Sequence, residues 1–414
     1  MKKVRRILCG ALAALLLAGC GSGAAGEYAI VETSYPARTQ KTEERVDTEE
    51  LVRFSSETAA KIFAEGENTV YSPVSLYMAL GMVTELTEGQ TKRQVTNLLG
   101  VSDSEALRQW TQSLWRQLYR DEKDSALWLG NAAFLNETMS FHKEPLEVLA
   151  KDYYASSYCL PMGTSGADKT IAAWLNQQTN DLLTDDTGAI RTEKRDLLRL
   201  YNTIYYKAPW QAEFFGGATA EDIFTADGTE QRADCMHIAS EGSPARKGEG
   251  YRCASLYLKD GGQMSFYLPD EGVAVEELLQ RENFLQEAED LLVDTFEVRV
   301  NWSVPKFDLH DSLKLNDALQ ALGVTDAFDV SKADFAPLTE QPAYVESVNQ
   351  AARVKIDEEG VEAAAYTEVD TNAAAAPPQE MPEEEMNLNR PFLFVIWKDG
   401  APLFVGAVQT MEGM

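Results

Sequence analysis

The sequence predicts an α+β protein, with helices in the first half of the chain and strands in the second. In the first half of the chain, apolar residues recur at helical spacing, and Ser72 and Pro73 form the cap and first turn of one helix. In the second half the pattern changes to that of strands, without alternating β-α-β units. The chain has 414 residues, 44% of them hydrophobic and 25% charged, so it can bury a sizeable core.

The expected helices and strands follow from the spacing of apolar residues and from the capping and turn residues between them. A capping Asp47 and an acidic first turn begin a helix whose apolar side carries Leu51, Phe54 and Ile62. Further helices are expected at residues 73–82, 91–99, 105–119, 145–154 and 167–179. Residues 296–304 alternate as a strand with one buried face, and residues 392–397 are apolar throughout, as in a strand covered on both sides. Lys398-Asp-Gly400 then predicts a hairpin into residues 403–408.

The first residues are typical of an export signal. Four basic residues precede the apolar residues 7–18, a stretch too short to cross a membrane as a helix. Leu17-Ala-Gly-Cys20 resembles the bacterial lipobox, which implies cleavage before Cys20 and attachment of lipid to Cys20. The alternative is an ordinary secretory signal with an incidental Cys20. We expect a signal peptide at 1–19, a flexible tether at 20–46 and one domain at 47–414.

The charge of the chain limits its partners. The net charge is −29, and removing residues 1–19 with their four basic side chains would leave −33. A polyanion of this size argues against binding to nucleic acid or to anionic lipid headgroups.

No catalytic or metal-binding pattern stands out. The three histidines, His142, His237 and His310, have no cysteine or carboxylate at ligand or triad spacing, and no nucleotide-binding loop is present. The sequence therefore predicts neither an enzyme nor a metal or cofactor site. Beyond the tether the chain has three cysteines: Cys159, Cys235 and Cys253. We expect them to be buried free thiols; the alternative is a disulfide between Cys235 and Cys253.

The stretch from Asp357 to Pro378 has the properties of both a loop and a strand. Residues 371–378 are small, polar or proline, which suits an exposed loop that a protease could cut. The preceding residues alternate, and small or β-branched side chains would share one face: Val361, Ala363, Ala365, Thr367 and Val369. We interpret the stretch as a loop patterned to enter a sheet. The alternative is an alanine-rich linker beside a charged edge strand.

Several segments in order resemble the serpin family. Asp357-Glu-Glu-Gly-Val-Glu-Ala-Ala-Ala365 is similar to the serpin hinge, and Asn389-Arg-Pro-Phe392 begins a strand similar to the one after the serpin reactive loop. Further matches cover residues 68–82, 91–99, 201–210, 304–307 and 333–335. The resemblance implies a serpin fold: helices packed on a large mixed central β-sheet, smaller antiparallel sheets, and an exposed reactive loop at about 360–390.

The resemblance also implies site residues. The hinge comprises Glu358, Glu359, Gly360, Val361, Glu362, Ala363, Ala364 and Ala365. The region where the sheet opens comprises Ser72, Ser75, Asn202, Trp210 and Gln350. Two positions depart from the family pattern. Gln350 stands where the family commonly has a histidine bonded to the asparagine, and its amide can still donate and accept. Val361 replaces a usual threonine or serine and suits a buried strand position.

What serpins do gives the expected function. A serine protease attacks the loop and forms an acyl-enzyme, and the freed loop inserts into the main sheet and drags the enzyme away. Counting forward from Gly360 by the family spacing places the cleaved bond at Ala374–Ala375, within a range that also includes Asn372, Ala373 and Ala376. Counting back from Pro391 gives Glu380–Met381 instead. We prefer the forward count, because the mechanism fixes the length of the inserted strand.

We therefore expect a monomeric, irreversible inhibitor of elastase-like or subtilisin-like serine proteases, because alanine beside the bond suits a shallow primary pocket. It would act outside the cytoplasm, anchored by lipid to the bacterial cell membrane. A non-inhibitory serpin-fold binding protein, whose loop is cleaved as a simple substrate, is the alternative. An unrelated solute-binding lipoprotein is a third hypothesis.

Overall fold

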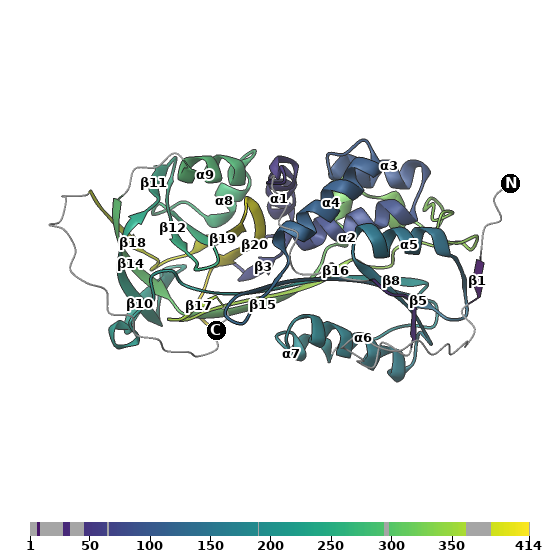
Figure 1. Ribbon diagram of the computed structural model, residues 1–414. Coiled ribbons are helices and arrows are strands. Elements are labelled where there is room, and N and C mark those ends of the chain that lie inside the picture. The colour runs from purple at the N-terminus through teal and green to yellow at the C-terminus, as the bar shows by residue number, and fades with distance from the viewer. Residues whose placement is uncertain are drawn as a thin grey trace.

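A computed structural model describes residues 6–8, 28–33, 45–63, 66–188, 190–293, 298–361 and 382–413. Figure 1 shows one long twisted sheet with most helices on one of its faces and α6 and α7 on the other. Two smaller sheets lie at one end of the long sheet. The architecture is thus the predicted α+β fold with a large mixed sheet.

The main sheet has eight strands. Seven of them follow the order β15 (Phe307–Lys314), β16 (Asn349–Ile356), β17 (Gly360–Val361), β8 (Leu198–Pro209), β5 (Ala126–Asn136), β7 (Ala155–Leu160) and β2 (Ala29–Val31). The eighth, β4 (Arg120–Asp121), pairs with β5. The sheet is mixed because β5 and β7 are parallel while the other neighbours are antiparallel.

The smaller sheets are only partly antiparallel. The antiparallel six-stranded sheet has the order β11 (Ala245–Gly248), β12 (Tyr251–Tyr257), β13 (Gln263–Pro269), β19 (Phe392–Lys398), β20 (Ala401–Val408) and β3 (Thr69–Tyr71). The four-stranded sheet has the order β18 (Glu383–Asn387), β14 (Val298–Pro305), β10 (Thr229–Ser243) and β9 (Ala220–Ala226). Since β18 runs parallel to β14, the prediction of purely antiparallel smaller sheets is wrong here.

Helices α1 to α6 lie where apolar spacing predicted them, whereas α7 to α10 were not predicted. Their bounds are α1 (Glu49–Ile62), α2 (Pro73–Leu86), α3 (Gly89–Leu98), α4 (Ser104–Leu118), α5 (Lys143–Asp152), α6 (Ser165–Gln178), α7 (Thr184–Thr187), α8 (Val275–Leu279), α9 (Phe284–Val293) and α10 (Asn316–Ala321). Two short 3₁₀ turns cover Gly216–Ala218 and Asp326–Phe328. In the described part of the chain, no helix is long and apolar enough to span a membrane.

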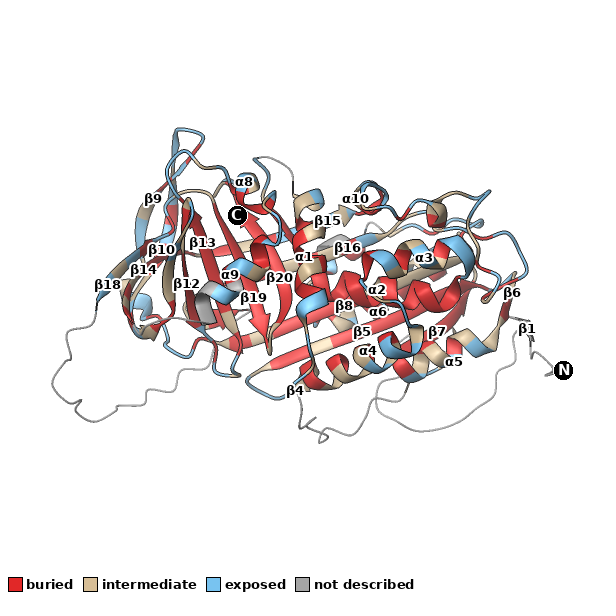
Figure 2. Cartoon of the chain, turned by 90° about the horizontal axis from the view of Figure 1, so that it is seen from above, coloured by how far each residue is buried: buried red, intermediate tan, exposed pale blue. Residues whose placement is uncertain are grey.

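Helix α2 lies against the main sheet and is almost completely buried. The Ser72 hydroxyl accepts a hydrogen bond from the Ser75 backbone N–H at 3.3 Å, and Pro73 occupies the first turn. Its helical residues are buried on every side except at one position, so the helix is part of the core rather than an amphipathic cover. Figure 2 shows this buried helix beside β5 and β8.

Residues 28–33 differ from the flexible tether predicted for 20–46. Ala29–Val31 forms the edge strand β2, antiparallel to β7, with Ala29 opposite Tyr158. Thr33 fixes the end of this segment, since its N–H donates to Ser156 Oγ at 3.2 Å and its hydroxyl donates to the Ala150 carbonyl at 2.9 Å. The unpaired edge of β7 explains the pairing, because backbone groups at a sheet edge need partners.

The predicted signal segment also contains a described strand. β1 (Arg6–Leu8) pairs antiparallel with β6 (Ser140–His142) in a two-stranded sheet that the sequence analysis did not anticipate. Cys235 and Cys253 are both free and buried, as expected. Cys159 is disulfide-bonded, so the expectation of a free thiol is wrong for that residue.

The two buried thiols should be unreactive. Burial raises the pKa of Cys253 to about 12 and that of Cys235 to about 11. At pH 8 about one molecule in a thousand or fewer would then carry a thiolate at either site. We expect neither thiol to react with a chromogenic disulfide reagent in the folded protein at pH 8, and both to react in guanidinium chloride. Reaction of one thiol in the folded protein at the rate of free cysteine would contradict this.

Candidate functional site

The main sheet has a slot between β8 and β16. The two strands do not pair with each other anywhere in the described chain; the two-residue strand β17 lies between them at one end. In that strand Gly360 is opposite Pro209, and Val361 is opposite both Ala208 of β8 and Ile356 of β16. The hinge predicted from the sequence thus begins as a strand of the sheet itself.

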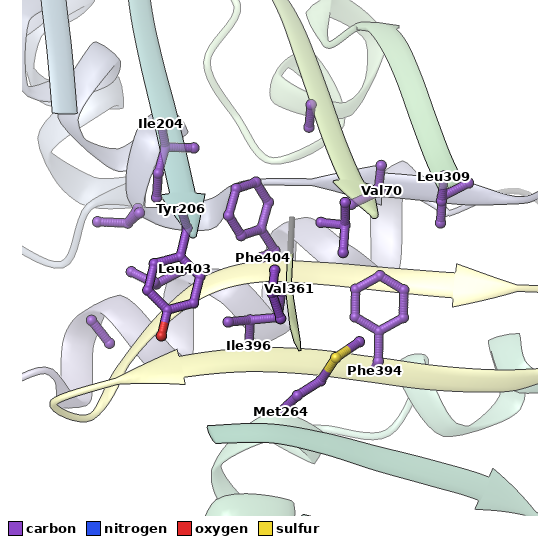
Figure 3. Packing of buried hydrophobic residues seen from close by; sticks show 14 of the residues in the cluster. Val70, Ile204, Tyr206, Met264, Leu309, Val361, Phe394, Ile396, Leu403 and Phe404 are labelled. Carbon is purple, nitrogen blue, oxygen red and sulfur yellow. The ribbon is translucent and has the colours of Figure 1, made fainter. Parts of the chain in front are cut away.

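Val361 is anchored in the core. Only 2% of the residue is exposed, and Figure 3 shows its side chain among Leu403, Ile396 and Phe404. Burial of a valine side chain contributes about 1.5–3 kcal/mol. The buried Val361 side chain therefore holds the start of the hinge in the sheet of the uncleaved chain.

Gly360 allows the hinge to approach β8 closely. A Cβ atom at this position would collide with the carbonyl oxygen of Ala208 and lie too close to Pro209 Cα. Both obstacles are backbone atoms, so no side-chain rotation could relieve the contact. Glycine is required here by close packing.

Backbone hydrogen bonds hold the residues before Gly360. The indole N–H of the fully buried Trp210 donates to the Asp357 carbonyl at 2.8 Å, and its backbone N–H donates to the Glu359 carbonyl at 2.9 Å. The Phe214 N–H donates to the Glu358 carbonyl at 3.3 Å. Trp210 therefore contacts the hinge directly.

An ion pair holds the side chain of Glu358. Lys306 Nζ lies 2.9 Å from Glu358 Oε2, and the Thr219 hydroxyl donates to Glu358 Oε1 at 2.7 Å. Partial burial alone would raise the pKa of Glu358, but the hydrogen bonds from Lys306 and Thr219 outweigh it and lower the pKa below its ordinary value. Thr219 was not predicted. Lys306 lies within a matched segment, but its charge alone gave no hint of its partner.

Gln350 caps the start of α2. Its Oε1 accepts from the Ser72 backbone N–H at 2.8 Å, and its Nε2 donates to the Ser72 carbonyl at 3.0 Å. Both Ser72 and Gln350 are buried. The amide thus pairs with both the backbone donor and the backbone acceptor of Ser72. Its oxygen and nitrogen are on the same carbon and can bond side by side, whereas the two nitrogens of a histidine ring point in different directions.

A separate chain of polar side chains serves β8. The Ser75 hydroxyl donates to Asn202 Oδ1, Asn202 Nδ2 donates to Asn131 Oδ1, and Asn131 Nδ2 donates to the Tyr153 carbonyl at 2.6 Å. Asn202 and Gln350 share no hydrogen bond. The polar residues beneath the sheet therefore form two separate groups. Gln350 bonds to Ser72 on the β16 side of the slot, and Asn202 bonds to Ser75 on the β8 side.

A cavity of about 60 Å³ lies in the slot, beyond the end of β17. Its walls come from α2, β8 and the start of β16, and they include Leu76, Leu80, Leu200, Asn202, Val348 and Gln350. The lining is mostly apolar and includes three amide side chains, those of Asn202, Asn349 and Gln350. The cavity is therefore large enough for a small side chain, and its lining suits one.

Some predicted site residues lie outside the described residues: Cys20, Glu362, Ala363, Ala364, Ala365 and the cleavage range from Asn372 to Ala376. The described ones gather in two places along the slot. Trp210 lies at the hinge; Ser72, Ser75, Asn202 and Gln350 lie around the cavity. Among the described residues, no three His, Cys, Asp or Glu side chains are grouped so that they could hold a metal ion.

Comparison with known proteins defines the family. The model of the family Serpin (serine protease inhibitor) matches residues 49–411. Serpin-Z2B of Triticum aestivum is 26% identical over 394 residues, covering 90% of this chain and 98% of the relative. The leukocyte elastase inhibitor of Homo sapiens is 29% identical over 354 residues, covering 82% and 92%. The native structure of the thermophilic serpin tengpin superposes with a TM-score of 0.79 at 26% identity, covering 92% and 98%.

This chain belongs to the serpin family, a family of serine protease inhibitors.

The pairing of Gln350 with Ser72 can be tested by truncation. Gln350→Ala would leave the buried N–H of Ser72 without its partner, at a cost of about 1–3 kcal/mol, while the Ser72 carbonyl would keep its hydrogen bond from the Leu76 N–H. We expect the denaturant midpoint of the first unfolding transition to fall accordingly. The exposed neighbour Asn349 provides the control, since Asn349→Ala should change stability by about 0.5 kcal/mol or less. Equal effects of the two variants would contradict the assignment.

Proposed function

We propose that this serpin is an irreversible suicide-substrate inhibitor of serine proteases that cleave beside small residues. The observation that carries the proposal is the strand β17, which already starts the loop between β8 and β16. Along the remainder of the slot, no described strand pairs with the facing edges of β8 and β16. A cleaved loop would enter it as a continuation of β17.

The register of β17 predicts where each loop residue would go. Pairing is antiparallel on both sides, with Val361 opposite Ala208 and Ile356. Extending it by six residues places Thr367 between Asn202 and Gln350. Two residues further, Val369 would lie between Leu200 and Val348, both of which line the cavity. The face predicted from the sequence alternation is thus the face that would point to α2.

The energetics favour insertion. Val369 would bury its side chain in the apolar cavity, worth about 1.5–3 kcal/mol. Each new backbone hydrogen bond along the two strand edges would add about 0.5–1.5 kcal/mol. Filling the cavity also restores dispersion contacts that its lining lacks. These terms have the same sign, so the uncleaved form is expected to be metastable.

The same register supports the forward count for the cleaved bond. Thr371 would lie opposite Leu198, the first residue of β8. Ala374–Ala375 follows three residues later, just past the end of the sheet. Glu380–Met381 would leave nine unpaired residues beyond it. Alanines at the bond suit elastase-like or subtilisin-like pockets, and the resemblance to leukocyte elastase inhibitors supports this specificity.

We further propose that the protein acts outside the cytoplasm, anchored through lipid on Cys20. That mature form cannot keep the disulfide of Cys159, because Cys235 and Cys253 are free, Cys9 would be removed with the signal segment and the Cys20 thiol would carry the lipid. The support is the lipobox-like Leu17-Ala-Gly-Cys20 after a basic and apolar segment.

The test combines adduct formation with two matched loop variants. Incubation with an elastase should give a one-to-one adduct that survives boiling in SDS. Thr367→Arg would place a charge on the inward face beside Asn202 and Gln350, so we expect cleaved serpin, free protease and no adduct. Glu368→Arg has the opposite parity and should keep the adduct.

Clean cleavage of the parent without adduct, across several such proteases, would contradict inhibition and favour the alternative of a non-inhibitory serpin-fold binding protein. Equal behaviour of the two variants would show that the insertion register is wrong.

A further inference from the structure

The docked strand β2 fixes where the N-terminal segment leaves the domain. β7 is antiparallel to β2, so the chain enters β2 from the end of the sheet at which β7 finishes. Two packed side chains, Ile30 and Val31, and the hydrogen bonds of Thr33 hold the segment in place. Figure 2 shows β7 at the opposite end of the molecule from β14 and β18.

The inserted loop would finish at the same end. Thr371 would be opposite Leu198, which pairs with Leu135 of β5, and Leu135 pairs with Cys159 of β7. The neighbour of Cys159, Tyr158, pairs with Ala29 of β2. Thr371 and Ala29 would therefore lie at the same level of the sheet. Four strand spacings separate them, about 19 Å in all.

The two segments also point the same way. The inserted strand would run antiparallel to β8, toward the end where Leu198 lies. Followed backward from Ala29 toward Cys20, the chain leaves β2 toward that end as well. The cleaved bond at Ala374–Ala375 would lie about 10 Å beyond Thr371 in an extended chain.

We infer that this serpin is held at the membrane by the end of the domain at which the trapped protease arrives. The inference rests on the proposed function, namely loop insertion and lipid on Cys20. The bilayer and the protease would then occupy the same side of the domain. The length of chain between Cys20 and β2 therefore controls how well a membrane-bound molecule can trap its target.

The chain between Cys20 and β2 is shorter than the diameter of a protease. Positions 20 and 28 are eight residues apart, and such a chain reaches at most about 29 Å. A protease of about 250 residues has a radius of gyration of about 18 Å, hence a diameter of about 46 Å. The protease does not fit between the bilayer and the domain end unless the domain tilts or β2 undocks. With β2 undocked, the chain from Cys20 to Val46 would reach about 94 Å.

The experiment varies this length in the full-length, lipidated protein on phosphatidylcholine vesicles. Three forms are compared: one lacking residues 22–27, the natural chain, and one with about twenty Gly and Ser residues inserted after Gly23. The readout is the number of serpin molecules consumed for each elastase molecule inhibited. We expect this number to rise several-fold in the shortened form and to be lowest in the lengthened form.

Soluble Cys20→Ser versions of the three forms are the controls, and their stoichiometries should agree. Equal stoichiometries on vesicles for all three lengths would overturn the inference. Failure of the soluble forms to trap elastase would instead contradict the proposed inhibition. Mass spectrometry that finds Cys20 without lipid would contradict the anchor, and the inference with it.

Discussion

The structure depends on one unfilled position in its main sheet. β8 and β16 lie on either side of the position of one strand. In the described chain, only the two residues of β17, Gly360 and Val361, occupy that position. Over the rest of the slot, the facing edges of β8 and β16 have no partner among the described strands, and a cavity lies at the far end from β17. The loop follows directly from β17, whose register continues along the slot. Under the proposed function, the sheet would gain stability by accepting it.

The polar side chains beneath the slot are arranged so that insertion need not break them. Gln350 bonds to Ser72 on the β16 side, and Ser75 bonds to Asn202 on the β8 side. Helix α2 is the common base of both groups. An incoming strand would pass between them, with a side chain of modest size facing the two amides. Gln350 thus substitutes for the usual histidine by bonding to the helix rather than across the slot.

The sequence predicted local features well and long-range pairing poorly. Helices α1 to α6, the alternating β14 and the apolar β19 and β20 follow from period and composition over a few residues, whereas the short or late helices α7 to α10 were missed. Register gave no local signal, so the parallel pairing of β18 and the docking of β2 were missed. The family resemblance supplied Gln350 and Trp210. It did not supply Thr219 or the partner of Lys306, because those contacts join segments far apart in the chain.

Hydrogen exchange of the backbone tests the central claim most directly. The amides at the slot face of β8, residues 198–206, and of β16, residues 349–354, should exchange rapidly in the uncleaved protein. After cleavage of the loop by an elastase, these amides should become protected by orders of magnitude, while amides of β19 and β20 stay unchanged. Unchanged exchange in β8 and β16 after complete cleavage would show that the loop does not enter the sheet, and the account would fail.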